Sequence, residues 1–314
     1  ELLVRKGYRV LGLIRESSME HLQNLEYLGI RDKIELIHYN VGNIFNIIYL
    51  MEKYKPDEFY NLVAQSSVGV SFAQPQKTIE LNVSSVLNIL ESIRSVSPTT
   101  KFYQASSSEM FGLVRKESLP VTEDFQFHPV SPYGISKATG HWITVNYREA
   151  YGLYTVCGIL FNHESALRGK NYVIKKIIET ALKIKQGKAS ELRLGNLAVW
   201  RDWGYAPKYV EAMWLMLQQE TPRDMLICSG EAQKLETFAQ KVFEKLDLDY
   251  KRHLVIDEKL LRPVDLEVIY GSNEIAKKHL GWDYDISSDG LIQKLIDDEI
   301  AFSAWTKKQL SDQL

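Results

Sequence analysis

Cysteine, long apolar runs and an excess of charge of one sign are all scarce in this chain. Two cysteines, Cys157 and Cys228, occur in 314 residues. They lie in apolar surroundings outside any Cys-x-x-Cys pattern, which favours buried thiols over a disulfide or a metal site. The seven histidines show no ligand spacing, so we expect no bound metal. No apolar run approaches the roughly 18 residues that a membrane-spanning helix needs.

The charge balance and composition are typical of a globular enzyme with a small-molecule substrate. The formal net charge of -2 is too small to indicate a nucleic-acid or membrane-surface partner. With 45% hydrophobic and 25% charged residues, the chain can build a large core and two lobes. We therefore expect a cytoplasmic protein that binds neither nucleic acid nor membrane.

The first half of the chain alternates between short apolar runs and helical patterns. Strands are predicted at 9–14, 34–38, 58–63, 101–105 and 155–160, and helices at 78–95 and 137–151. This βαβ rhythm predicts an α/β protein with a Rossmann-like, doubly wound parallel sheet. After Asn162 longer amphipathic helices follow, including 172–186 and 235–246. They predict a second, smaller C-terminal lobe for substrate.

The segment 102–137 holds a candidate redox site with an added carboxylate. Tyr133 and Lys137 are four residues apart, so a helix places them on one face, where the ammonium can lower the pKa of the phenol. Ser131 is a plausible N-cap for that helix, and Ser107 and Glu109 follow an apolar strand. Ligands meet parallel sheets at such strand ends. The plainer alternatives are an interfacial aromatic beside a solvated amine, and an ordinary polar turn.

These motifs together resemble the extended short-chain dehydrogenase/reductase family and, within it, the GDP-mannose 4,6-dehydratases. The matching stretches cover nearly the whole chain. They are FYNLVAQSSVGVSF (59–72), FYQASSSEMFG (102–112), SPYGISKATGHWITVNYREAYGL (131–153), GILFNHESALRG (158–169), LRLGNLAVWRDWGYAPKYVEAMWLMLQQ (192–219) and LLRPVDLEVIYG (260–271).

The resemblance implies two interleaved domains and an oligomer. The dinucleotide-binding domain would span 1–163, with returning segments near 199–220 and 265–272. The substrate lobe would comprise 164–198, 221–264 and 273–314, and the sugar nucleotide would lie across the cleft between the lobes. Members of the family form homodimers and homotetramers, and their tetramers meet at the loop that contains Arg15.

The glycine-rich turn that cradles a dinucleotide in this fold has no counterpart in the sequence as it stands. The opening stretch, ELLVRKGYRVLGLIR, resembles the end of the first helix followed by the second strand. A truncated record is one explanation. The other is a chain that no longer binds the cofactor tightly. The residues upstream of Glu1 would decide between the two explanations.

The resemblance implies NADP as cofactor, bound by Arg15, Ser17, Asn40, Tyr133 and Lys137. A guanidinium group such as that of Arg15 matches a 2′-phosphate bidentately. Glu16 stands where the family has a second arginine, and it would repel a phosphate but suit a free ribose hydroxyl, so NAD remains a competitor. Arg15 and Glu16 could also be a solvated surface pair.

The resemblance also assigns contacts to the substrate, GDP-mannose. A sugar hydroxyl would meet Ser66. Pyrophosphate and guanosine would meet the following residues: Asn162, Val173, Lys176, Gly195, Arg201 and Arg262. The basic members could neutralise a diphosphate, although a lone basic residue is more often surface charge. Several neighbours depart from the family pattern: Lys175 for Arg, Trp200 for Lys, Ala166 for Pro and Asp265 for Glu.

The implied reaction is a dehydration with an internal redox cycle. Tyr133 would remove the C4 hydroxyl proton as hydride passes to the cofactor, and Glu109 would take the C5 proton. Glu109 and Ser107 would help the C6 hydroxyl leave as water before hydride returns to C6, which gives the GDP-4-keto-6-deoxy sugar. The alternatives are a reductase of that keto sugar, another nucleotide-sugar dehydrogenase, or a non-catalytic nucleotide-sugar binder.

Overall fold

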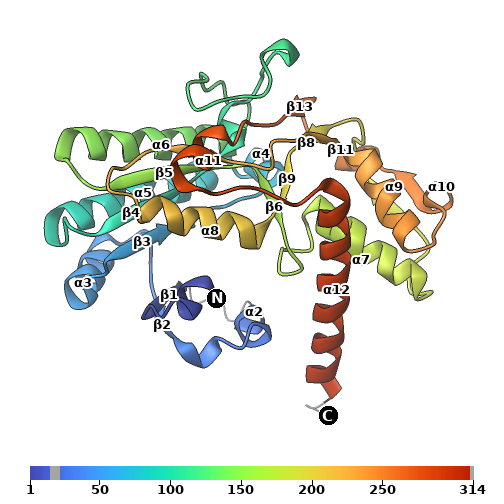
Figure 1. The fold of residues 1–314 in the computed structure, drawn as a ribbon, viewed down its shortest axis with the longest axis horizontal. Helices are drawn as coiled ribbons and strands as arrows, with labels where there is room; N and C mark the ends of the chain where they lie inside the picture. Colours follow the sequence, from blue (N-terminus) through green and yellow to red (C-terminus); the bar gives the residue numbers. More distant parts are fainter. Residues whose placement is uncertain (15–21, 312–314) are drawn as a thin grey trace. The chain divides into compact units, whose positions relative to one another are not determined.

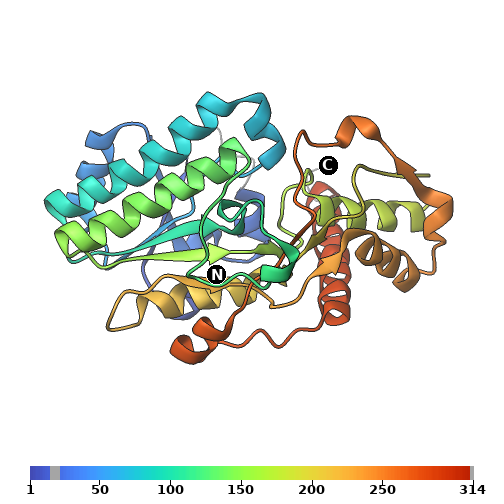
Figure 2. The same cartoon turned by 90° about the horizontal axis from the view of Figure 1, so that it is seen from above.

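The computed structural model describes residues 1–14 and 22–311. The chain divides into two compact units, and each is described by itself. Unit 1 comprises residues 1–113, 123–160 and 210–225, and unit 2 comprises residues 114–122, 161–209 and 226–314. Figure 1 and Figure 2 show the fold in two views, coloured along the sequence.

The elements follow one another along the chain as strands and helices. The strands are β1 (Val10–Ile14), β2 (Ile34–His38), β3 (Glu58–Asn61), β4 (Lys101–Ser107), β5 (Thr155–Leu160), β6 (Asn162–Glu164), β7 (Leu192–Leu194), β8 (Trp200–Arg201), β9 (Trp203–Tyr205), β10 (Met225–Ile227), β11 (Gln233–Lys234), β12 (Leu254–Ile256) and β13 (Val268–Ile269). The helices are α1 (Leu2–Arg5), α2 (Leu22–Tyr27), α3 (Ile44–Tyr54), α4 (Val68–Ala73), α5 (Pro75–Val96), α6 (Pro132–Tyr151), α7 (Val173–Lys185), α8 (Ala206–Leu217), α9 (Leu235–Lys245), α10 (Tyr250–His253), α11 (Glu274–Leu280) and α12 (Ser288–Ser311). Short 3-10 turns complete them: η2 (Arg31–Lys33), η3 (Ser108–Met110), η4 (Lys116–Ser118) and η5 (Glu258–Leu260).

Parallel strands form the centre of unit 1. The strands β3, β4 and β5 pair in parallel within a sheet of order β10-β5-β4-β3, and β1 pairs with β2 in a parallel sheet of their own. The helices α5 and α6 lie side by side over one face of the β3-β4-β5 strands (Figure 2). Their apolar faces, with α3 and Phe102 of β4, form a core that contains Ile89, Leu90 and Ile93. Parallel strands buried in this way are typical of α/β proteins.

Unit 2 is built on helices with short strand pairs. Its core gathers the apolar faces of α7, α9 and α12, with members such as Ile177, Phe238 and Leu295. The strand β12 pairs in parallel with β7, β6 pairs in parallel with β9, and β8 lies between antiparallel β11 and parallel β13. Because these strands are only two or three residues long, loops connect most of the elements of unit 2. Binding residues often occur on loops.

The predicted elements agree with the structure to within a few residues. The strands predicted at 9–14, 34–38, 58–63, 101–105 and 155–160 correspond to β1 to β5, and α/β architecture is confirmed. The parallel strands are hydrogen-bonded into separate sheets, a detail that periodicity alone does not reveal. The compact units group 199–209 and 265–272 with unit 2 and 210–225 with unit 1. The assignment of segments to cofactor or substrate stays a prediction.

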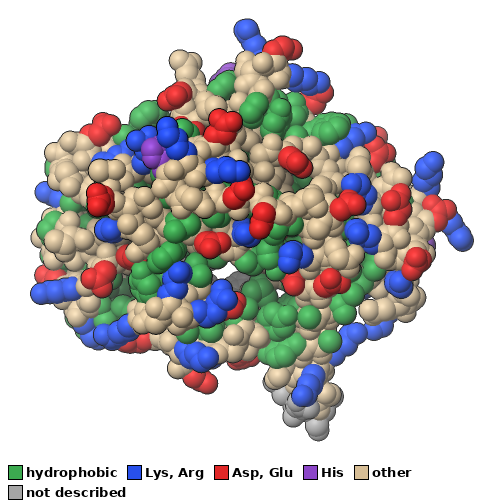
Figure 3. Space-filling model, in the orientation of Figure 1, with side chains coloured by type: hydrophobic (Ala, Val, Ile, Leu, Met, Phe, Trp, Pro, Cys, Tyr) green, Lys and Arg blue, Asp and Glu red, His purple; other side chains and the backbone are tan. Residues whose placement is uncertain are grey.

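Surface charge and apolar length agree with the composition. Figure 3 shows acidic and basic side chains interspersed over the visible face, without a broad area of one sign. Among the described residues, no helix combines the length and the apolarity that a membrane crossing requires.

Candidate functional site

Tyr133 and Lys137 lie on the first two turns of α6. The helix begins as predicted, because the Ser131 side chain accepts a hydrogen bond from the Gly134 N–H at 3.0 Å and Pro132 occupies the first turn. Both side chains are buried, and the Lys137 Nζ lies 5.8 Å from the centre of the Tyr133 ring. The spacing of four residues therefore produces the expected pair of phenol and ammonium on one helix face.

The Lys137 ammonium is anchored to the central strand of unit 1. Its Nζ donates to the Ala105 carbonyl of β4 at 2.8 Å. Burial lowers the pKa of Lys137 to about 8, because a charged amine is poorly solvated in the interior. At neutral pH the group still carries most of its proton, so it can favour the ionised form of a neighbouring phenol.

Ser107 and Glu109 occupy the turn that follows β4. Ser107 is the last residue of the strand and the N-cap of η3, where its Oγ accepts from the Glu109 N–H at 3.3 Å. A Cβ placed on Gly134 would lie 2.7 Å from the Glu109 carbonyl oxygen, so glycine permits this turn to contact the first turn of α6. The structure thus brings the segment of Ser107 and Glu109 against the helix that carries Tyr133.

The sequence reasoning missed Asn82, which joins three parts of unit 1. The Asn82 side chain of α5 accepts from the Gln65 N–H at 2.8 Å and donates to the Ser136 Oγ at 2.9 Å. Ser136 in turn donates to the Tyr133 carbonyl at 2.7 Å. The signal in the sequence was a polar residue on the buried face of an amphipathic helix. This network fixes the loop that contains Ser66 relative to the start of α6.

The predicted cofactor residues are described only in part. Arg15 and Ser17 lie outside the described residues. Asn40 follows β2, where its Oδ1 accepts from the Gly42 N–H at 3.0 Å and its own N–H donates to the Asn46 Oδ1 at 3.2 Å. The Asn40 side chain is therefore held in a tight turn beyond the carboxyl end of a parallel strand. This is the end at which nucleotides bind in open α/β sheets.

The predicted substrate residues divide between the units. Ser66 lies in unit 1, directly before Ser67, which caps α4. The other six belong to unit 2: Asn162 in β6, Val173 and Lys176 in the first turn of α7, Gly195 after β7, Arg201 in β8, and Arg262 after η5. Gly195 lies close to another backbone segment, since a Cβ there would meet the Leu260 carbonyl oxygen at 2.9 Å.

Arg201 is more heavily engaged than the sequence suggested. Its Nη2 donates to Asp265 at 2.7 Å and its Nη1 donates to the Leu266 carbonyl at 2.7 Å. The Arg262 Nη1 also lies 3.8 Å from the same Asp265 oxygen. One carboxylate thus faces two guanidinium groups, which leaves an excess of positive charge in this part of unit 2. Such an excess suits an anionic ligand.

The sequence reasoning also missed Glu164, a buried carboxylate. Arg168 donates to its Oε1 at 2.7 Å, whereas its Oε2 is buried and has no hydrogen-bond partner among the described residues. Burial raises the pKa of Glu164 to about 7, although the nearby guanidinium opposes this shift. Arg168 also lies 4.0 Å from the centre of the Tyr172 ring, directly before α7. The pair therefore connects β6 to the helix that carries Val173 and Lys176.

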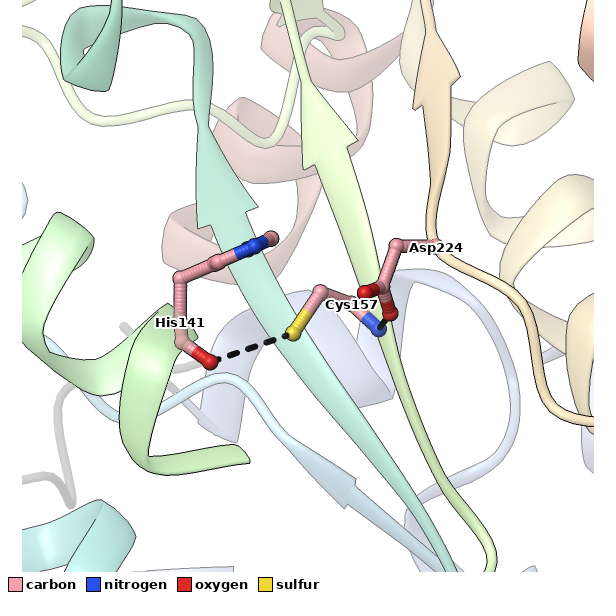
Figure 4. A group of neighbouring side chains, drawn as sticks. All are labelled: His141, Cys157 and Asp224. Carbon is pink, nitrogen blue, oxygen red and sulfur yellow. Dashed lines mark hydrogen bonds between the residues drawn. The ribbon is translucent and has the colours of Figure 1, made fainter. Parts of the chain in front are cut away.

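Within the described residues, one group has the composition of a metal site: His141, Cys157 and Asp224 of unit 1 (Figure 4). The Asp224 oxygens are already bound, because they accept from both Arg148 Nη atoms at 2.7 and 2.8 Å and from the Cys157 N–H at 2.7 Å. Burial raises the pKa of the Cys157 thiol well above its usual range, which opposes the thiolate form that metals need. The group is better explained as a polar cluster that joins α6 to β5.

Several known structures share the fold. The Pseudomonas aeruginosa protein RMD, solved in complex with NADPH, superposes with a TM-score of 0.80 at 20% identity, over 95% of this chain and 100% of its own. The dTDP-glucose 4,6-dehydratase from Bacillus anthracis, solved in complex with NAD, superposes with a TM-score of 0.83 at 18% identity, over 97% and 92%. At these identities the likeness shows the fold alone.

Sequence comparison identifies the family. The profile of GDP-mannose 4,6 dehydratase matches residues 1–295. GDP-mannose 4,6 dehydratase 1 from Arabidopsis thaliana is 41% identical over 99% of this chain and 88% of its own length. GDP-mannose 4,6 dehydratase from Homo sapiens is 36% identical over 94% and 86%. The expectation drawn from the motifs is confirmed, and the chain belongs to the GDP-mannose 4,6-dehydratase family.

Proposed function

We propose that the protein is a lyase that converts GDP-D-mannose to GDP-4-keto-6-deoxy-D-mannose and water. The observation that carries this proposal is the buried Tyr133–Lys137 pair beside the turn of Ser107 and Glu109. It combines a phenol near a cation with a carboxylate and a hydroxyl. Membership of the family supports the same reaction.

The residues fit a nicotinamide dinucleotide. The Lys137 Nζ bonds Ala105, two residues before the carboxyl end of β4, and such strand ends are where nucleotides bind in this kind of sheet; relatives of the same fold were solved with NADPH and with NAD. When bound, the nicotinamide supplies the acceptor for hydride from C4 and its donor back to C6. We favour NADP because the guanidinium group of Arg15 can donate two parallel hydrogen bonds to a 2′-phosphate. NAD is the second candidate, because the carboxylate of Glu16 would repel that phosphate. Asn40 and Ser17 complete the proposed cofactor contacts.

Tyr133 acts as the base at the C4 hydroxyl. Its phenol is buried, and the Lys137 ammonium stabilises the phenolate that accepts the proton. The Ala105 carbonyl fixes the ammonium, because it accepts a hydrogen bond at 2.8 Å. Oxidation at C4 gives a ketone, which makes the proton on C5 more acidic.

Glu109 and Ser107 act at C5 and C6. The Glu109 carboxylate removes the C5 proton, and the pair then assists the departure of the C6 hydroxyl as water. The hydrogen bond between the Ser107 Oγ and the Glu109 N–H holds the turn in one conformation. General acid-base assistance of this kind contributes about 10²–10⁴-fold in rate.

The nucleotide contacts follow the family assignment. Lys176, Arg201 and Arg262 face the diphosphate, and Arg262 shares Asp265 with Arg201, so the excess positive charge there supports this role. The remaining contacts are Ser66 at a sugar hydroxyl and Asn162, Val173 and Gly195 at the nucleotide. We further propose that the protein acts as a homodimer or homotetramer in the cytoplasm.

The decisive experiment is Glu109→Gln, assayed with GDP-mannose and a catalytic amount of NADP. The wild type should release one water per sugar without accumulating reduced cofactor, which excludes the reductase. The variant should lose at least about 10²-fold in rate and still bind GDP. The exposed Glu117→Gln is the matched control, with unchanged turnover. Unchanged turnover in Glu109→Gln would remove its assigned role.

A further inference from the structure

Unit 2 contains a pocket that no proposed contact uses. It has a volume of about 320 Å³ and is lined by residues from β8, β9, β11, α9 and the start of α12. We call it the Trp200 pocket, after the indole at its rim. The lining residues used below are Trp200, Trp203, Lys234, Lys241 and Ser288. Its volume lies at the lower end of the roughly 300–1,000 Å³ that is usual for small-molecule sites.

The pocket lies apart from the cluster around Asp265. Trp200 and Arg201 are neighbours in β8, and successive side chains of a strand point to opposite faces. The Arg201 guanidinium bonds Asp265 and the Leu266 carbonyl, whereas the Trp200 ring lines the pocket. The proposed diphosphate contact and the pocket therefore occupy different sides of the strand.

The cationic groups of the pocket are already neutralised. The Lys234 Nζ lies 2.6 Å from Glu236, and the Lys241 Nζ lies 2.6 Å from Asp289. A phosphate would have to compete with these carboxylates for both ammonium groups. The lining therefore favours an uncharged ligand over a nucleotide.

Two features of the lining require an amphipathic ligand. Trp200 exposes 42% of its surface although it is a large aromatic side chain, and Trp203 lines the same pocket. The Ser288 Oγ is buried and has no hydrogen-bond partner among the described residues, a state that is costly for a hydroxyl. A ligand that covers an indole with C–H groups, and that bonds the Ser288 hydroxyl once this side chain rotates toward the pocket, would satisfy both features.

We propose that the Trp200 pocket binds the ring of an uncharged saccharide, a hexopyranose or its simple glycoside. A pyranose ring has an apolar face of C–H groups and a rim of hydroxyl groups, which matches the indoles and the unpaired Ser288 hydroxyl. The inference is independent of the proposed reaction.

The test is titration of the purified protein with methyl α-D-mannopyranoside and with methyl α-D-glucopyranoside. Binding is followed by saturation-transfer NMR and by calorimetry. At least one glycoside should bind with a Kd near about 1 mM, and Trp200→Ala should raise that Kd by about tenfold. Trp142→Ala removes a 59% exposed indole from α6 of unit 1 and is the matched control, with unchanged Kd.

A second variant and a competitor separate the pocket from other sites. Ser288→Ala should weaken glycoside binding by about fivefold and leave the melting temperature unchanged or higher, because it removes an unpaired buried hydroxyl. Saturating GDP should leave the glycoside signal in place. The proposal is overturned if neither glycoside binds, if Trp200→Ala leaves the Kd unchanged, if GDP displaces the glycoside, or if inorganic pyrophosphate binds there instead.

Discussion

The buried ammonium of Lys137 in unit 1 is bonded differently from three buried or half-buried cations of unit 2. In unit 1, Lys137 donates to the Ala105 carbonyl, and within the described residues it has no carboxylate at ion-pair distance, whereas Arg148 of the same unit is paired with Asp224. In unit 2, each of three buried or half-buried cations donates to a carboxylate: Arg168, Lys175 and Arg201. A carbonyl satisfies a hydrogen bond but leaves the charge of the ammonium uncompensated.

This difference separates a cation that acts on a neighbour from cations that hold structure. An uncompensated ammonium favours a negative charge on the nearest acid, and here that acid is the Tyr133 phenol. When a cation is paired with a carboxylate, the two opposite charges largely cancel, so the pair has little effect on a neighbouring acid. Removal of one partner leaves an unpaired charge in the interior. Lys137 and the cations paired with carboxylates should therefore respond oppositely when they are altered.

Lys137→Met should produce the largest effect. Loss of the ammonium should lower kcat by about 10²–10⁴-fold, because the phenol loses the charge that makes it a base near neutrality. The melting temperature at pH 7 should stay equal or rise, since a buried charge without a carboxylate is replaced by an apolar side chain. Steady-state kinetics and calorimetry check both parts. A large loss of stability would assign Lys137 a mainly structural role.

The pH dependence of the wild type sharpens the same prediction. The pKa of Lys137 is lowered to about 8 in the folded protein. Its proton is therefore lost as the pH rises through about 8, and kcat should fall there. The unfolded chain keeps that proton up to a pKa of about 10.4, so Lys137 should contribute a rise in stability with pH between these values. Lys137→Met should lack this contribution to stability.

Asp265→Asn tests the paired charges of unit 2. Arg201 would lose its carboxylate while remaining buried, which should lower the free energy of unfolding by about 3 kcal/mol, the lower end of the range for buried pairs, because Asp265 is only half-buried. GDP should raise the melting temperature of the variant more than that of the wild type, because its diphosphate replaces the lost negative charge. Asp283→Asn, from an exposed pair with Lys277, is the control. Equal GDP shifts in all proteins would contradict this reading of Arg201.

Asn82→Ala should have a smaller effect on the uncharged network of unit 1. It leaves the Gln65 N–H without its side-chain acceptor and Ser136 without a donor, at a cost of about 1–3 kcal/mol. The KM for GDP-mannose should rise more than kcat falls. Gln65 would lose the side-chain bond that holds it, and the proposed sugar contact, Ser66, is the next residue. Asn88→Ala, on the same helix with one bond to the Val41 carbonyl, is the matched control. A pure loss of stability without a change in KM would argue against a positioning role.

The sequence predicted what depends on local spacing. The cap at Ser131, the pairing of Tyr133 with Lys137 and the strand before Ser107 all follow from neighbours along the chain. The bonds made by Asn82 join residues 17 and 54 positions away, and no periodicity reports them. The Arg201–Asp265 pair likewise spans 64 positions.

Motif matching also does not reveal which hydrogen bonds a side chain makes within the protein. The family pattern gave Arg201 a diphosphate contact, and only the structure reveals that its guanidinium donates to Asp265 and to a carbonyl. Cys157 was expected to be a buried thiol, which the structure confirms. Its proximity to His141 and Asp224 arises from the packing of α6 on β5 and could not be read from ligand spacing.

The group of His141, Cys157 and Asp224 gives the smallest expected effect. If Asp224 is committed to Arg148 and to the Cys157 N–H, the cluster contains no free carboxylate for a metal, and the thiol pKa is raised by burial. A chelator should therefore leave both the melting temperature and the turnover unchanged, and added Zn²⁺ should not stabilise the protein. Arg148→Met would release Asp224, and only this variant should gain stability with Zn²⁺. Stabilisation of the wild type by Zn²⁺ would show that the carboxylate exchanges its arginine for the metal.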